Sequence, residues 1–354
     1  MSSSERNNAV TIAKAIAIIL MVMGHSKCPV IINNMLDLIR MPLFFIMSGY
    51  CFKDKYLANS VSYLKKRIKG IYLPYIKWSL FFLFIHNTLY TLNIYNNLFC
   101  IEGYTDHIYY LQEIAKKTIG IVIFMKSHDI LLGGYWFLNS LLWGSILYYI
   151  TKRICVACGG GEPTLCIGVL LLISILISST KMIPEYLPFS SRNFIAASFI
   201  YMGNYLNNKA FTLYKHTGFI IITFVLLFLL SLFWHSAITT LTTLEIIPYF
   251  IVATIGSLSL FSLSHKINDN NLIGRFLTKI GGITFNILTW HMLSFKIVSY
   301  MLILYYGLDI SRLAEFPVIL EYAQKGWWVL YLIVGVFIPY SCYCINKWIN
   351  SKLT

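Results

Sequence analysis

Residues 7–26 read NNAVTIAKAIAIILMVMGHS, a hydrophobic stretch long enough to cross a membrane. Two ionisable residues interrupt it, Lys14 and His25. On a helix, an offset of eleven residues is about 1100°, three turns plus roughly 20°, and about 16 Å along the axis. Both side chains therefore point the same way. Ionisable groups on one face of a membrane helix are costly unless they line a polar cavity, so this face is a candidate functional site.

The composition around this stretch is that of a polytopic membrane protein. Of the 354 residues, 58% are hydrophobic and only 12% are charged, and the mean hydropathy is +0.69. Soluble globular proteins carry about twice that charge fraction. No small-residue cleavage site follows the first stretch, so we expect a retained span rather than a signal peptide.

Hydropathy predicts an all-α bundle of ten transmembrane helices, with residues 1–354 as a single transmembrane domain and no appended soluble domain. The predicted spans are 9–27, 31–52, 71–93, 133–151, 163–180, 190–207, 216–234, 244–264, 281–305 and 327–346. The segment 109–125 predicts a further helix that is interfacial or half-inserted.

The positive-inside rule sets the expected orientation. With the N-terminus inside, Lys and Arg are about twice as frequent in the inner segments as in the outer ones. We therefore expect both termini in the cytoplasm and a multi-pass protein of the inner (plasma) membrane. The net charge of +14 is explained by these loops. Because no soluble basic domain could hold a duplex, we expect no nucleic-acid partner.

The eight cysteines give little sign of a metal centre. Cys155 and Cys158 form a C-x-x-C pair, but the next pair, Cys342 and Cys344, lies far away with a different spacing. Zinc needs a second pair of ligands at suitable spacing, so we predict no metal site.

Arg40 lies deep in the second predicted span, in MLDLIRMPLFFIMSGYCF (35–52). Arginine cannot lose its proton, so it needs a partner, water or an anionic ligand. Asp37 is three residues away on the same face, and a structural ion pair is the alternative to a functional role. Pro42 and Gly49 permit a bend in this span that would open a cavity.

A basic segment follows, YLKKRIKGIYLPY (63–75), with Lys66, Arg67 and Lys69 at its centre. It is either a positive-inside determinant in contact with anionic lipid or a cytoplasmic site for a phosphorylated donor, because Arg and Lys clusters suit phosphates.

Further polar residues lie at span ends or within spans. An imidazole such as His25 suits a general base, although it could simply cap carbonyls at a helix end. His291, in GGITFNILTWHMLSF (281–295), is either a buried core histidine or an acid–base group. Trp136 and Asn139, in GGYWFLNSLLW (133–143), mark the outer mouth of the fourth span, where an aromatic belt would also explain the tryptophan.

In their order and spacing these motifs resemble the acyltransferase 3 family of membrane-bound acyltransferases, over nearly the whole length. The resemblance rests on K-x10-H (Lys14, His25), RMPLFFIMSGY (40–50), LPY (73–75), WFLNSLL (136–142), YMGNYL (201–206) and IGGITFNILTWH (280–291).

This resemblance implies an integral membrane enzyme that moves an acetyl or other short acyl group onto a hydroxyl of a glycan, such as O-antigen or another surface polysaccharide. Acyl-CoA is the implied donor and co-substrate, with no further cofactor. His25 takes the role of the catalytic histidine, Lys14 is the basic residue paired with it, and Arg40 matches the arginine of the second-span motif.

Two other hypotheses for the function stay open. Buried Lys14, Arg40 and His291 also suit the polar path of a transporter or flippase for a lipid-linked sugar, although we see no clear halves or paired broken helices. A non-catalytic scaffold in a glycan-assembly complex would leave the Lys14 and His25 face unexplained. The sequence does not fix the acceptor sugar, nor whether the chain forms a homo-oligomer or binds glycan-assembly partners.

Overall fold

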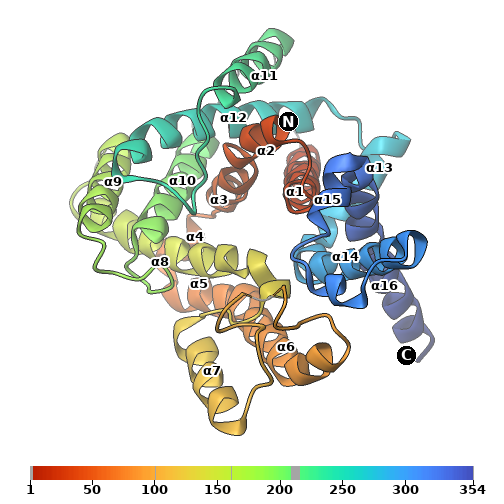
Figure 1. The fold of residues 1–354 in the computed structure, drawn as a ribbon. Helices are drawn as coiled ribbons and strands as arrows, with labels where there is room; N and C mark the ends of the chain where they lie inside the picture. Colours follow the sequence, from red (N-terminus) through yellow and green to blue (C-terminus); the bar gives the residue numbers. More distant parts are fainter. Residues whose placement is uncertain (1–2, 100, 161, 209–215, 354) are drawn as a thin grey trace. The chain divides into compact units, whose positions relative to one another are not determined.

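The structure, a computed structural model, describes residues 3–99, 101–160, 162–208 and 216–353 (Figure 1). Every regular element within these ranges is a helix, and none is a strand. The all-α prediction is therefore confirmed.

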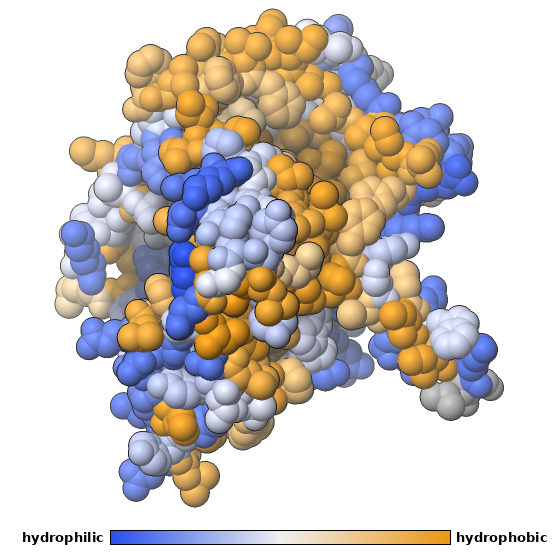
Figure 2. All heavy atoms as spheres, turned by 45° about the vertical axis from the view of Figure 1, so that its right-hand side comes forward, coloured by the Kyte–Doolittle hydropathy of each residue, from blue (hydrophilic) through white to orange (hydrophobic). Residues whose placement is uncertain are grey.

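Eight helical segments of the described ranges are long and apolar enough to cross a membrane. They are Asn8–His25, Val30–Tyr50, Ser60–Thr91, Ile130–Ala157, Pro163–Thr180, Thr243–Lys266, Thr284–Tyr306 and Leu320–Lys352. The other two predicted spans correspond to α10 (Ser191–Asn208) and α11 (Thr217–Ser231), which are helical but are not among the eight. With 15 residues, α11 is shorter than the roughly 20 that a span needs. The protein is thus a multi-pass membrane protein. Figure 2 shows broad hydrophobic areas interrupted by hydrophilic ones.

The chain folds into two compact units. The first unit comprises Met1–Ala17, Asn34–Pro74 and Phe137–Gly281, and the second comprises Ile18–Asn33, Tyr75–Trp136 and Gly282–Thr354. Helix α1 (Ser3–His25) contributes to both units.

Small residues hold the first unit together. A Cβ on Gly49 of α3 (Arg40–Tyr50) would overlap the carbonyl of Ile200 in α10, and a Cβ on Gly203 of α10 would overlap the carbonyl of Ile46. The two helices therefore cross with their backbones in contact, as small residues allow in membrane proteins. The other elements of this unit are α4 (Lys55–Ala58), α5 (Ser60–Arg67), η1 (Ile68–Tyr72), α8 (Trp136–Ala157), α9 (Pro163–Thr180), α11, η4 (Thr243–Glu245), α12 (Ile246–Lys266) and α13 (Leu272–Gly282).

The second predicted span is broken rather than bent. Helix α2 (Val30–Asp37) ends before α3 begins, and Leu38 and Ile39 form a turn between them. The interruption lies upstream of Pro42 and Gly49, the two residues that permit a bend. Pro42 has no N–H to donate to the carbonyl of Leu38, so the chain is interrupted four residues upstream, and the proline lies in the first turn of α3, where it is tolerated. Gly49 instead serves the crossing with α10.

The second unit is built around α14 (Thr284–Tyr306) and α16 (Trp328–Leu353), which pack together. Its other elements are α6 (Leu73–Thr91), α7 (Leu111–Phe124), η2 (Ile130–Tyr135), η5 (Ile310–Ala314), α15 (Leu320–Tyr322) and η6 (Ala323–Trp327). Helix α7 is the extra helix expected at 109–125, and its insertion in the membrane stays a prediction.

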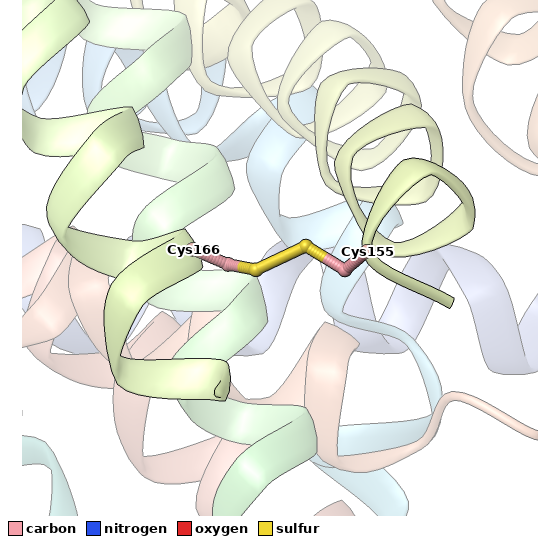
Figure 3. Close-up of a disulfide and its surroundings, with 2 residues drawn as sticks. All are labelled: Cys155 and Cys166. Carbon is pink, nitrogen blue, oxygen red and sulfur yellow. A yellow bond between two sulfur atoms is a disulfide. The ribbon is translucent and has the colours of Figure 1, made fainter. Parts of the chain in front are cut away.

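One disulfide joins two neighbouring helices of the first unit. Cys155, near the end of α8, is bonded to Cys166, in the first turn of α9 (Figure 3). The thiol of Cys158 is exposed. The sequence reasoning considered Cys155 only with Cys158 and missed this pairing.

Candidate active site

Two histidines come together in the second unit. His25 is the last residue of α1 and is half-buried, and His291 lies in the middle of α14 and is fully buried. Their ring centroids are 5.4 Å apart, with the ring planes inclined at 39°. Two candidates that the sequence presented separately are therefore neighbours.

The hydrogen bonds of His291 fix how it can act. Its Nδ1 lies 2.9 Å from the carbonyl oxygen of Ile287 and 3.1 Å from that of Leu288. A carbonyl can only accept, so Nδ1 carries the proton and donates. In the neutral ring Nε2 then has the lone pair, and this buried atom has no hydrogen-bond partner in the described part of the chain. His291 thus offers one basic nitrogen in a buried position.

Close packing of α1, α14 and α16 holds the two histidines in place. A Cβ on Gly335 of α16 would overlap the ring of Phe295 and lie 2.9 Å from Cγ1 of Val22. Val22 lies about one turn before His25, and Phe295 meets the His291 ring edge-on, with centroids 5.7 Å apart. The small residue at position 335 therefore brings the three helices into contact beside the histidine pair.

The glycine-containing segment η2 packs on the same part of α14. A Cβ on Gly134 would lie 2.7 Å from Leu288, and the Tyr135 hydroxyl is 2.8 Å from Oγ1 of Thr289. The Tyr135 ring contacts Tyr75 at 5.3 Å between centroids. Tyr75 of the LPY motif and the motifs GGYW and ILTWH therefore lie around the turn of α14 that carries His291.

A buried carboxylate fixes the start of η2. The Asp129 carboxylate accepts hydrogen bonds from the Tyr95 hydroxyl at 2.7 Å and from the backbone N–H of Leu131 at 2.9 Å. Burial raises the pKa of Asp129 to about 6. Burial also lowers the pKa of the neighbouring His128 to about 4. This dry polar cluster anchors the segment that supports α14.

Arg40 lies in the first unit, at the first residue of α3. It forms an ion pair with Asp37. The second carboxylate oxygen of Asp37 lies 3.4 Å from Nε2 of His235, and the Tyr249 hydroxyl donates to the Asp37 backbone carbonyl at 3.0 Å. The ion pair that the sequence offered as the alternative for Arg40 is therefore present.

Lys14 also lies in the first unit, in the middle of α1. It is half-buried. It makes no hydrogen bond or ion pair with any residue that the structure describes. A partly buried ammonium without a carboxylate partner is costly, so this position suits an anionic ligand.

The basic segment contains two exposed lysines and an arginine that is held by a hydrogen bond. Lys66 and Lys69 are exposed, and Lys66 donates to the Tyr56 hydroxyl at 3.2 Å. Arg67 is half-buried: it donates from Nη2 to Ser48 Oγ at 3.1 Å and lies over the Tyr63 ring at 5.0 Å. The Nε of Arg67 is buried with no partner among the described residues. The three residues are close in sequence, but they differ in exposure, since only the two lysines are exposed.

Comparison with known proteins identifies the family to which the chain belongs. The profile of the acyltransferase domain family, acyltransferase 3, matches residues 7–347. The chain belongs to the acyltransferase 3 family. The protein is therefore a membrane acyltransferase, and the match covers both compact units. No curated protein and no solved structure matches this chain significantly.

Trp136 and Asn139 of this acyltransferase fall in different units. Trp136 begins α8, directly after η2, and is half-buried in the second unit. Asn139 is 1% exposed in the first unit and donates to the Tyr186 carbonyl at 3.0 Å. For Asn139 the structure thus shows a bond that secures a loop.

Lys296 of the acyltransferase is a buried residue to which the sequence reasoning gave no role. Its ammonium donates to the carbonyls of Leu313 at 2.9 Å and Glu315 at 2.7 Å. It therefore ties the end of η5 to α14. A lysine within a hydrophobic span was the available signal, but its backbone partners lie in a loop whose course the sequence does not reveal. The described residues contain no group of three His, Cys, Asp or Glu that could hold a metal ion.

Proposed function

We propose that this acyltransferase moves an acetyl or other short acyl group from acyl-CoA to a hydroxyl of a cell-surface or lipid-linked glycan, with His25 as the general base. The observation that carries the proposal is the pairing of His25 with His291, whose Nε2 is buried and oriented as an acceptor. Enzymes of this kind need a neutral imidazole near the reacting hydroxyl.

The proposed reaction is direct transfer. His25 removes the proton from the glycan hydroxyl while that oxygen attacks the thioester carbonyl. The C–S bond of the donor then breaks, the ester forms, and the imidazolium returns the proton to the thiolate of CoA. A route through an acyl-histidine would use the same residue as a nucleophile.

His291 supports this reaction as a positioning residue. Once His25 is protonated, both of its ring nitrogens carry an N–H, and Nε2 of His291 is a basic nitrogen at ring-contact distance. A hydrogen bond to it would stabilise the imidazolium in a low-dielectric setting. The rigid packing at Gly335 keeps this acceptor in place.

The cationic residues of the first unit are proposed to bind the donor. Lys66, Arg67 and Lys69 would hold the phosphates of CoA, since Arg and Lys form strong hydrogen bonds to phosphate. Lys14, without a partner among the described residues, would contact the donor further along α1. Arg40, oriented by Asp37, has the proposed role of stabilising negative charge on the donor or the acyl carbonyl.

The proposed setting is the inner (plasma) membrane, where the enzyme acetylates a polysaccharide such as O-antigen. The test is NMR of the surface polysaccharide from a gene-deletion strain that carries wild type or His25→Ala, with membrane levels of both proteins verified. We expect acyl signals to return with wild type only. Full acylation with His25→Ala would refute the mechanism. Loss of polysaccharide from the surface, rather than loss of its acyl groups, would indicate the transporter alternative.

A further inference from the structure

An apolar cavity of about 720 Å³ lies in the second unit between α14 and α16. One wall is a stripe of α14 at helical spacing, and the other is a stripe of α16 that runs antiparallel to it. Trp78 of α6, Ile94 and Leu313 close the remaining side. The α14 residues of the lining are Asn286, Trp290, Leu293, Ser294, Lys296, Ile297 and Tyr300, and those of α16 are Ile338, Pro339, Cys342, Tyr343 and Asn346.

This cavity is a wedge that opens toward the C-terminal end of α16. Before Pro339 the helices touch, because Gly335 meets Phe295 and Tyr331 hydrogen-bonds to Ser299 at 2.9 Å. Pro339 lies inside α16, where a proline weakens and bends a helix. From Ser341 to Lys352 every residue is exposed. We call this space the α14–α16 wedge.

The dimensions of the wedge suit a hydrocarbon chain. The stripe from Asn286 to Tyr300 is about 21 Å long at 1.5 Å per residue. One leaflet of the hydrocarbon core is about 15 Å thick, half of about 30 Å. The wedge therefore runs along more than one leaflet. Its wall offers mostly aromatic and aliphatic surface, with a few amide, hydroxyl and thiol groups and the side chain of Lys296.

Positively charged side chains at the open end of the wedge favour a lipid with an anionic head group. Lys347 directly follows the lining residue Asn346, and Lys352 lies over the Trp348 ring at 4.0 Å. Both lysines are exposed, as is the tryptophan, and Trp with Lys is the usual anchor at a membrane interface. Basic residues next to a span attract anionic lipids through their charge.

We infer that the α14–α16 wedge binds one acyl chain of an anionic phospholipid whose head group lies at Lys347 and Lys352. Lys296 also lines the wedge, where its ammonium donates to the Leu313 and Glu315 carbonyls. This site is separate from the proposed acyl transfer and does not depend on it.

The test is photo-crosslinking in nanodiscs that contain phosphatidylglycerol or phosphatidylcholine with a diazirine on the acyl chain, followed by peptide mapping. We expect labels on peptides of 286–300 and 338–346, several-fold more with phosphatidylglycerol. Cys342→Trp fills the wedge and should reduce that labelling at least about fivefold, whereas Ile345→Trp, on the same exposed turn but outside the lining, should not.

A second variant leaves the wedge intact. Lys347→Gln combined with Lys352→Gln changes only exposed residues, and should remove the preference for phosphatidylglycerol while the protein stays monodisperse. Equal labelling by both lipids in wild type would overturn the head-group assignment. Labelling of the wedge that survives Cys342→Trp unchanged would overturn the site itself.

Discussion

A histidine whose Nδ1 donates to two backbone carbonyls can act only through Nε2, and this restricts what His291 can do. Replacing it with glutamine keeps polarity but removes the basic ring nitrogen beside His25. We expect His291→Gln to lower acyl transfer about 100-fold, the lower end of what a positioned acid–base group contributes. The measurement is acylated glycan formed per membrane-inserted protein.

The matched control for this variant is His265→Gln, the same change in a histidine near the end of α12 in the first unit. It should retain most activity. Because a structural role would also lower activity through misfolding, the thermal midpoint of His291→Gln should stay within a few degrees of wild type. A variant that is stable and as active as wild type would remove His291 from the proposal.

Asp129 should make stability depend on pH. Burial raises its pKa to about 6 in the folded protein, above the ordinary unfolded value of about 3.9. The folded state therefore binds more protons than the unfolded state between these values, and stability falls as the pH rises through this window. The total loss of unfolding free energy is about 3 kcal/mol, since a pKa difference of one corresponds to about 1.36 kcal/mol.

The measurement is the thermal midpoint of wild type and Asp129→Asn between pH 4 and pH 7. An asparagine oxygen can still accept from Tyr95 and Leu131, so the variant should fold. The difference between the two curves isolates Asp129 from other groups such as His107, whose pKa is raised, chiefly by its hydrogen bond to Glu113. A pH-independent difference would show that Asp129 does not titrate in this range.

Individual residues were predictable from the sequence where local spacing carries the information. The Arg40 and Asp37 pair follows from an i,i+3 spacing on one face. The contact of His25 with His291 could not be predicted, because it depends on the packing of helices distant in sequence. The same holds for Lys296 and its carbonyl partners.

The crossing of α3 and α10 depends on two glycines that approach each other's backbone. Ala at position 203 would force its Cβ onto the Ile46 carbonyl, so we expect Gly203→Ala to destabilise the protein by about 1–3 kcal/mol, the usual cost of overpacking. Gly168 of α9 is exposed, with nothing within 4 Å of the same added atom. Gly168→Ala should be neutral or stabilising by up to about 1 kcal/mol.

The thermal midpoint in detergent, read by fluorescence-detected size exclusion, compares the two glycine variants. If the thermal midpoint of Gly203→Ala is equal to or higher than that of Gly168→Ala, the backbones of α3 and α10 are not in contact.

Helices as elements were largely predictable, because long apolar runs leave few alternatives in a membrane. All ten predicted spans contain helix in the described residues, although only eight are long and apolar enough to cross. The break between α2 and α3 was not predicted, because the effect of Pro42 falls on the carbonyl four residues earlier. The pattern of hydropathy does not show such a local interruption.

Across the whole molecule, the family motifs divide between the two units. Tyr75, the last residue of the LPY motif, lies in the second unit, as do His25 and His291. The motifs RMPLFFIMSGY and YMGNYL form the helix crossing of the first unit. The resemblance could list these motifs in order along the chain. It could not reveal which of them pack together, because that depends on tertiary contacts.

Orientation is the remaining property of the whole molecule, and the disulfide offers a test of it. The distribution of Lys and Arg predicts that the segment between Cys155 and Cys166 lies on the cytoplasmic side. Thiols are kept reduced in the cytosol. We therefore expect this pair as thiols in living cells and as a disulfide only after purification without reductant.

The measurement uses a variant that retains only Cys155 and Cys166, in cells quenched with acid and then labelled with maleimide-PEG under denaturing conditions. Two PEG additions are expected without prior reduction, and one in the Cys166→Ser control. If the two additions appear only after a reductant, the pair is oxidised in the cell. The loop would then face the oxidising side of the membrane, and the orientation derived from the basic residues would be reversed, together with the side from which the donor is proposed to enter.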